Sequence, residues 1–73
     1  ILVYPNPAHD IINIGMVEDM NEIRIYNSTG QIIYHEQVNH NRVEVDVNSF
    51  LPGMYLVQTR TENGVFTERF LRQ

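Results

Sequence analysis

The chain contains no cysteine, no lysine and no tryptophan among its 73 residues. Without cysteine it can form neither a disulfide nor a thiolate metal site, so burial and strand pairing must hold the fold together. Without lysine, all five cations are arginines, and nine carboxylates leave a net charge of −4. Because such a chain repels phosphate, we expect no nucleic-acid partner.

Long apolar runs are missing too. No run approaches the ~20 residues that span a bilayer, and no basic amphipathic helix is available for a membrane surface, so we expect no transmembrane segment. Residues 1–4 do not look like a signal peptide, and they fall in or just before a strand. We therefore expect residues 1–73 to be a single domain cut from a longer chain.

Apolar residues recur with period two between turn residues, and nowhere at helical spacing. The pattern predicts an all-β fold of about seven short antiparallel strands, and its spacing favours a β-sandwich or a barrel. Polar residues at 18–21 and 39–41 are interpreted as turns between strands. The expected strands are residues 1–4, 10–16, 22–26, 31–38, 42–47, 54–61 and 65–72.

Several turns carry a specific signal. Residues 27–30 end in Gly30, which tolerates positive φ, and Asn63-Gly64 is a strong hairpin signal. The triplet that starts at Asn27 also matches an N-glycosylation acceptor, but a turn needs the same residues. After the Pro52-Gly53 corner, Tyr55 is expected to clamp the corner through its hydroxyl.

No residues combine into a catalytic or metal-binding pattern. His9 and Asp10 are adjacent and would point to opposite faces, and neither Ser28 nor Ser49 sits in a nucleophile elbow. The three histidines lack the spacing of zinc ligands. The outward Glu44 and Asp46 suit a solvated strand face better than a glycosidase pair. We therefore expect neither enzymatic activity nor a cofactor.

Aromatic residues could in principle form a sugar-stacking platform. Tyr55 and Phe70 lie in the most apolar strands and are expected in the core, which leaves Tyr26 and Tyr34 as the exposed pair.

Four motifs follow one another along the chain, and together they resemble the C-terminal sorting domain of the type IX (Por) secretion system. The resemblance spans essentially the whole chain, although the family usually has lysine where this closing motif has arginine. The motifs are Tyr4-Pro5-Asn6-Pro7-Ala8, the strand-turn-strand of residues 23–31 with Gly30, Leu51-Pro52-Gly53-Met54-Tyr55-Leu56-Val57, and Arg69-Phe70-Leu71-Arg72.

The resemblance implies a seven-stranded immunoglobulin-like domain at the end of a larger cargo protein. It implies that the domain directs this cargo from the periplasm across the outer membrane, so that the cargo is secreted or placed on the cell surface. The implied partners are the outer-membrane translocation machinery and a sortase-like surface protease that removes the domain. Recognition is assigned by motif match to Arg69, Phe70, Leu71 and Arg72, and Gln73 fits a true C-terminus.

A different reading remains open from the residues alone. The chain could be an accessory immunoglobulin-like sandwich that binds carbohydrate or a neighbouring domain. Weak self-association through edge strands is a further alternative, because an unpaired strand edge is a template for another strand.

Overall fold

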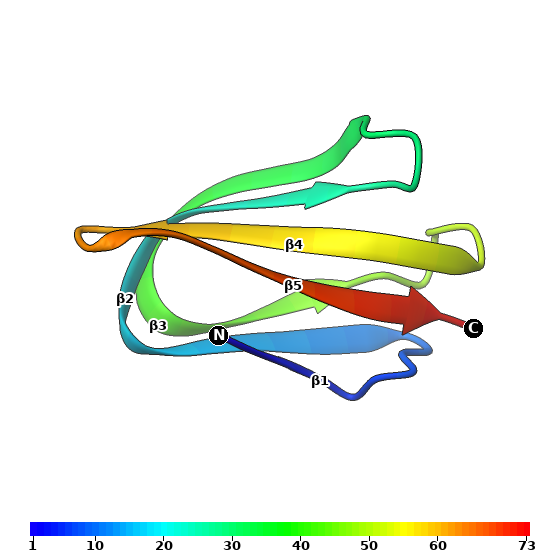
Figure 1. Ribbon diagram of the computed structural model, residues 1–73. Coiled ribbons are helices and arrows are strands. Elements are labelled where there is room, and N and C mark those ends of the chain that lie inside the picture. The colour runs from blue at the N-terminus through cyan, green and yellow to red at the C-terminus, as the bar shows by residue number, and fades with distance from the viewer.

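The computed structural model describes all residues from 1 to 73 and contains five strands and no helix. Consequently no helix is available that could cross a membrane. All strand pairs are antiparallel and belong to one sheet, in which β2 is central (Figure 1). The strands are β1 (Leu2–Tyr4), β2 (Ile11–Tyr26), β3 (Ile32–Asp46), β4 (Gly53–Thr61) and β5 (Gly64–Arg72).

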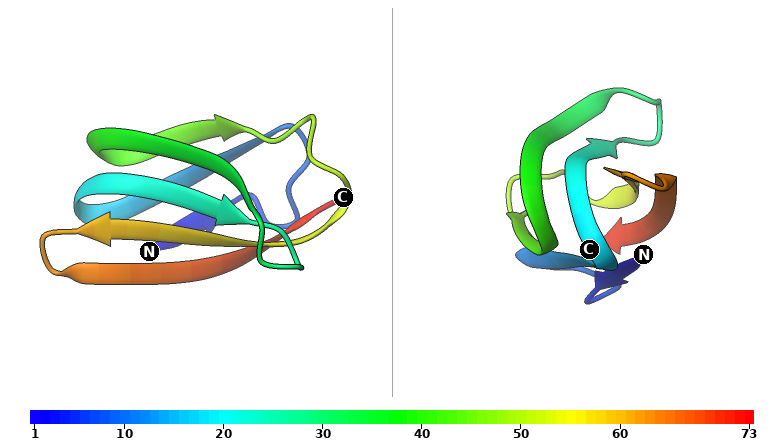
Figure 2. Two further views of the ribbon diagram at one scale, coloured as in Figure 1. Left: turned by 90° about the horizontal axis from the view of Figure 1, so that it is seen from above. Right: turned by 90° about the vertical axis from the view of Figure 1, so that its left-hand side faces the viewer.

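The sheet is curled because its two longest strands bend together. β3 pairs with β2 on both sides of the bend, while β1 pairs with the first half of β2 and β4 with the second half. The register between β2 and β3 shifts between Gly15 and Met20 and again before Glu22, as expected where bulges bend a strand. As a result, the two halves of the sheet face each other across the core (Figure 2).

The predicted strand count was wrong for a physical reason. Residues 18–21 and 39–41, interpreted as turns, lie inside β2 and β3, where Met20 still pairs with His40. Bulges let the strands bend sharply while they remain side by side, so their polar residues mark a bend and not a loop. The predicted turns at residues 27–30 and 62–64 are confirmed, and each connects two paired strands.

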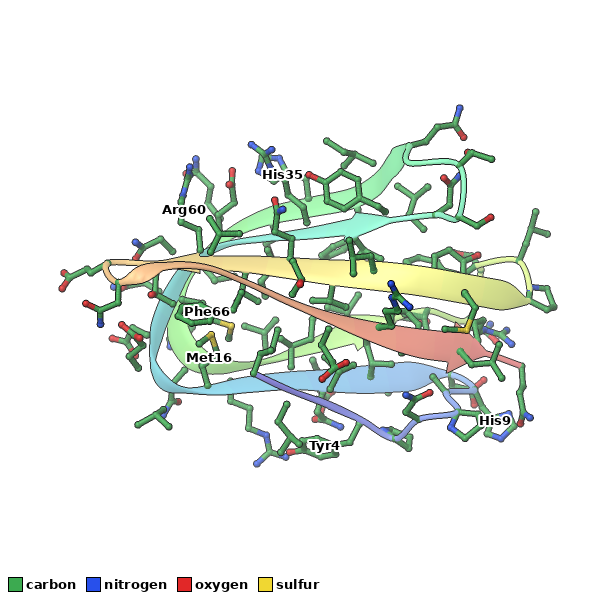
Figure 3. The ribbon with its side chains drawn as sticks, viewed as in Figure 1. Tyr4, His9, Met16, His35, Arg60 and Phe66 are labelled. Atoms are coloured by element: carbon green, nitrogen blue, oxygen red, sulfur yellow. The ribbon has the colours of Figure 1, made fainter.

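The core lies between the two halves of the sheet and is built from alternate residues of each strand. Val45 and Val47 face inward, and Tyr55 stacks on Phe70 with ring centroids 5.4 Å apart. Side chains fill the space between the two halves (Figure 3). The buried apolar residues are Val3, Ala8, Ile12, Ile14, Met20, Ile23, Ile25, Val45, Val47, Tyr55, Val57 and Phe70.

Candidate recognition site at the end of the last strand

The first and last motifs of the chain meet at one end of the molecule. The Asn6 side chain accepts a hydrogen bond from the Leu71 amide at 3.0 Å, and its Nδ2 donates to the Arg69 carbonyl at 3.4 Å. Ala8 continues this pairing with hydrogen bonds to the Leu71 carbonyl and from the Gln73 amide. The segment after β1 therefore covers the outer edge of β5 at its C-terminal end (Figure 1).

Asn6 lies between two prolines, and its side chain takes over the pairing with β5 that they cannot provide. Pro5 and Pro7 follow cis peptide bonds and have no backbone N–H to pair with β5. The side-chain amide of Asn6 supplies both a donor and an acceptor, and so replaces the backbone groups of a neighbouring strand. Tyr4, which precedes the prolines, ends β1, and its ring lies 5.8 Å from the Arg42 guanidinium carbon.

The side chains of the closing motif divide into two pairs. Those of Phe70 and Arg72 are engaged within the domain, whereas those of Arg69 and Leu71 are free to contact a partner. Phe70 is fully buried in the core. The Arg72 guanidinium donates from Nε to the Val47 carbonyl at 2.9 Å and from Nη2 to the Asn48 carbonyl at 3.0 Å. Arg69 and the half-buried Leu71 alternate with Phe70 and so lie on the opposite, outer face of the sheet. The sequence motif groups all four residues together. Which of them face the core and which face outward becomes clear only once the core is known.

The Tyr55 corner clamp is present, since its hydroxyl donates to the Leu51 carbonyl. Gly53, at the start of β4, has a φ of +151°, and Gly30 has a φ of +86°. Asn27 organises the turn before Gly30: its Oδ1 accepts hydrogen bonds from Thr29 and Gln31, and its Nδ2 donates to the Gln31 side chain at 2.9 Å. The Asn27 amide is therefore engaged in the turn, as expected for the structural role of this triplet.

A groove of about 490 Å³ lies on the outer face beside this end of β5. Tyr26, Leu56 and Arg69 cross it in one row, because Tyr26 pairs with Leu56 and Leu56 with Arg69 on neighbouring strands. No carboxylate lines the groove. The lining residues are Tyr26, Asn27, Ser28, Gly30, Met54, Tyr55, Leu56, Gln58 and Arg69.

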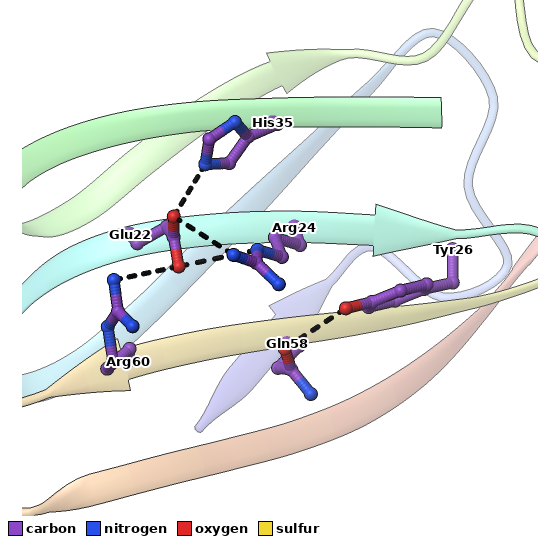
Figure 4. Close-up of polar contacts among 6 residues, drawn as sticks. All are labelled: Glu22, Arg24, Tyr26, His35, Gln58 and Arg60. Atoms are coloured by element: carbon purple, nitrogen blue, oxygen red, sulfur yellow. Dashed lines mark hydrogen bonds and ion pairs between the residues drawn. The ribbon is translucent and has the colours of Figure 1, made fainter. Parts of the chain in front are cut away.

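A charged cluster farther along the same face was missed by sequence reasoning. The nearly buried Glu22 carboxylate lies 2.6 Å from His35 Nε2, 3.0 Å from Arg60 Nη2 and 3.4 Å from Arg24 Nε (Figure 4). The hydrogen bond from His35 is the main reason why the pKa of Glu22 is lowered, with partial burial opposing it and both arginines adding to it. The spacing of Glu22 and Arg24 could have predicted their shared face, but the partners on β3 and β4 depend on the topology.

The remaining candidate residues do not form a site. The structure holds no group of three or more histidine, aspartate or glutamate side chains that could bind a metal ion. His9 and His35 lie in separate regions of the molecule (Figure 3). Tyr34 pairs with the inward-facing Ile25, whereas Tyr26 faces outward and its hydroxyl bonds Gln58, so the two tyrosines do not share a stacking surface.

Comparisons with known proteins agree with the motifs. Beta-agarase D of Zobellia galactanivorans is 34% identical over 62 residues, which are 85% of this chain but 12% of that protein. A solved structure of PorZ, a surface component of the type IX secretion system of Porphyromonas gingivalis, matches 99% of this chain and 11% of that one, with a TM-score of 0.75. At 22% identity, this second likeness shows the fold alone.

The chain thus spans about an eighth or less of the relatives that it matches. The family profile described as "Secretion system C-terminal sorting domain" matches residues 2–73, nearly the whole chain. The chain therefore belongs to the C-terminal sorting domains of the type IX (Por) secretion system.

Proposed function

We propose that this chain is the C-terminal secretion signal of a larger secreted protein, with no chemistry of its own. It directs that cargo from the periplasm across the outer membrane, and a sortase-like surface protease then removes it and leaves the cargo attached to the cell surface. The family supports the signal role, because its members are sorting signals and imply an N-terminal cargo and a secretion machinery.

The observation that carries this proposal is the contact between the first and last family motifs. Asn6 and Ala8 hold the end of β5 in place, so the motifs that are far apart in sequence form one folded surface. On this surface Arg69 and Leu71 are the available recognition residues. Phe70 and Arg72 position the strand from within, through the core and through the carbonyls of residues 47 and 48.

We also infer that the fold is a variant of the seven-stranded immunoglobulin-like sandwich. β2 and β3 each bend once, so the five strands contain seven straight segments. Three of these segments (β1 and one half each of β2 and β3) oppose the other four across the core (Figure 2).

A reporter fusion tests the signal role. An inert, periplasmically exported reporter is fused to the N-terminus of this chain and expressed in a bacterium with a type IX system. Delivery of the reporter to the surface or medium, dependent on the secretion system, is the expected result. Retention in the periplasm together with glycan binding by the fusion would favour the accessory binding domain instead.

Point variants test the recognition residues more sharply than a deletion does. Removing residues 69–73 should strand the cargo in the periplasm, but it also removes Phe70 from the core. The double variant Arg69→Ala, Leu71→Ala leaves Phe70 and Arg72 in place, and we expect it to fold and to lose surface delivery. Normal delivery of this variant would contradict the role of the two residues; Arg42→Ala is the matched control.

Sedimentation of the isolated chain tests self-association. β3 pairs only with β2, and most of the outer edge of β5 is unpaired, so two edges are available for strand addition.

A further inference from the structure

Arg69 is the one arginine of the five with no partner for its guanidinium. Arg24 and Arg60 pair with Glu22, Arg42 lies over the Tyr4 ring, and Arg72 donates to backbone carbonyls. The neighbouring Glu68 carboxylate accepts a hydrogen bond from the backbone amide of Arg69 and makes no ion pair with the Arg69 side chain. In a chain with nine carboxylates, an unpaired guanidinium is a local positive site that the molecule itself leaves uncompensated.

The surroundings of Arg69 are apolar and amide-rich. The exposed Met54, the partly exposed Leu56 and the ring of Tyr26 lie in the same groove, and Gln58 adds an amide. The groove volume of about 490 Å³ falls within the range of ligand-binding clefts, ~300–1,000 Å³. An apolar surface beside one cation suits a ligand that presents an apolar group beside one anionic group.

The neighbouring strand edge favours an extended ligand. The backbone groups of Leu71 face away from β4, toward Asn6 and Ala8, and those of Val65 and Thr67 share this orientation because the pattern alternates. No strand pairs with β5 at these two residues. Thr67 pairs with the groove residue Gln58, so this free edge adjoins the groove. A protein segment can therefore add along this edge and place alternate side chains on the outer face of the sheet.

We propose that the groove lined by Tyr26, Met54, Leu56 and Arg69 binds an extended segment of a protein partner, with a carboxylate on Arg69 and a neighbouring apolar side chain on Met54 and Leu56. This inference rests on the proposed signal function and assigns the chemistry of its partner. An anionic membrane is the weaker alternative, because the net charge of the whole chain is −4 and an anionic surface would repel it.

Peptide titration tests this chemistry directly. The ¹⁵N-labelled chain is titrated with acetyl-Leu-Glu-Leu-amide and with its glutamine counterpart up to about 10 mM, a range that detects millimolar binding. We expect amide shifts at Tyr26, residues 54–58 and Arg69, with the glutamate peptide binding at least about threefold more tightly. In Arg69→Gln this preference should disappear, whereas in Arg42→Gln it should persist.

Three results would overturn the inference: no shifts in the groove, equal binding of the two peptides, or a glutamate preference that survives in Arg69→Gln. Binding to phosphatidylglycerol vesicles that depends on Arg69, without peptide binding, would overturn it in favour of a lipid.

The reporter fusion separates this inference from the signal role. If the wild-type chain and Arg69→Gln are exported equally well, the signal role stands and the groove is not its recognition site. If the wild-type chain fails to export the reporter, the signal role fails, while the titration still decides what the groove binds.

Discussion

Gly53 opens β4 with a φ of +151°, a backbone conformation that side chains rarely adopt. A Cβ built there meets nothing within 4 Å, so the cost of a substitution comes from the backbone and not from a clash. We expect Gly53→Val to lower the free energy of unfolding by about 1–3 kcal/mol, measured by urea denaturation. Gly15→Ala is the control, because Gly15 lacks a positive φ and its added Cβ would lie 3.8 Å from the nearest atom. An equal loss in both variants would contradict the backbone argument.

Phe70 is the largest fully buried side chain and packs on Tyr55. Truncating a buried phenylalanine removes its burial and leaves a cavity, so Phe70→Ala should cost about 3–5 kcal/mol, a large part of the stability of a small domain. Thermal unfolding followed by circular dichroism measures this loss of stability. Phe66→Ala, at a partly exposed position on the same strand, should cost clearly less. Similar melting temperatures for both variants would count against the central place of Phe70.

Residues whose role follows from local pattern were predictable, and those whose role follows from topology were not. Tyr55 and Phe70 were predicted as core, and the Tyr55 hydroxyl as a clamp, because strand alternation and the preceding corner determine both. The capping of β5 by Asn6 and the partners of Glu22 on β3 and β4 depend on which strands become neighbours. No residue spacing encodes these contacts.

At the scale of elements, β5 is an edge strand whose two ends differ. Its C-terminal end is covered by Asn6 and Ala8, while Val65 and Thr67 lie at an unpaired edge. Edge strands are templates for other chains, so this arrangement restricts strand addition to one part of β5.

The capping by Asn6 has a measurable consequence. In Asn6→Ala the Leu71 amide loses its acceptor, and we expect its hydrogen exchange to accelerate about two- to tenfold, in line with the net value of one hydrogen bond. Exchange followed by NMR gives this rate for each residue. Asn41→Ala, at an exposed asparagine with no side-chain hydrogen bond, should leave the Leu71 rate unchanged. An unaltered rate in Asn6→Ala would show that another group protects this amide.

The elements themselves were largely predictable. Each expected strand lies in a strand of the structure except for at most one residue at an end. The hairpins at residues 27–30 and 62–64 formed as expected, because their turn residues carry a local mechanism. The bends of β2 and β3 were mistaken for turns. A bulge in a long strand uses the same polar residues as a short loop, and the difference arises only when two strands bend side by side.

At the scale of the whole molecule, the Glu22 cluster ties three strands together, since its residues come from β2, β3 and β4. The folded chain holds the Glu22 proton less tightly than the unfolded chain, because the pKa is lowered from its ordinary 4.5. The stabilisation is therefore complete above about pH 4.5 and is lost as the pH falls through the lowered pKa.

Glu22→Gln tests this pH dependence. The variant should be less stable than the wild type at neutral pH, and the difference in free energy of unfolding should shrink as the pH falls below about 4.5. Urea denaturation at several pH values measures the difference. Glu44→Gln changes an exposed carboxylate that makes no ion pair and should follow the wild-type profile. A difference that stays constant down to the lowest pH would contradict the ionic contribution of Glu22.

The place of β5 in the fold has a consequence for synthesis. Phe70 is the largest buried side chain of the core, and Arg72 donates two hydrogen bonds to the corner after β3. We therefore expect a polypeptide that ends before Phe70 not to reach the closed sheet, because it lacks the largest core side chain and both of these hydrogen bonds. Under the proposed signal role, such a truncated polypeptide would carry no folded signal.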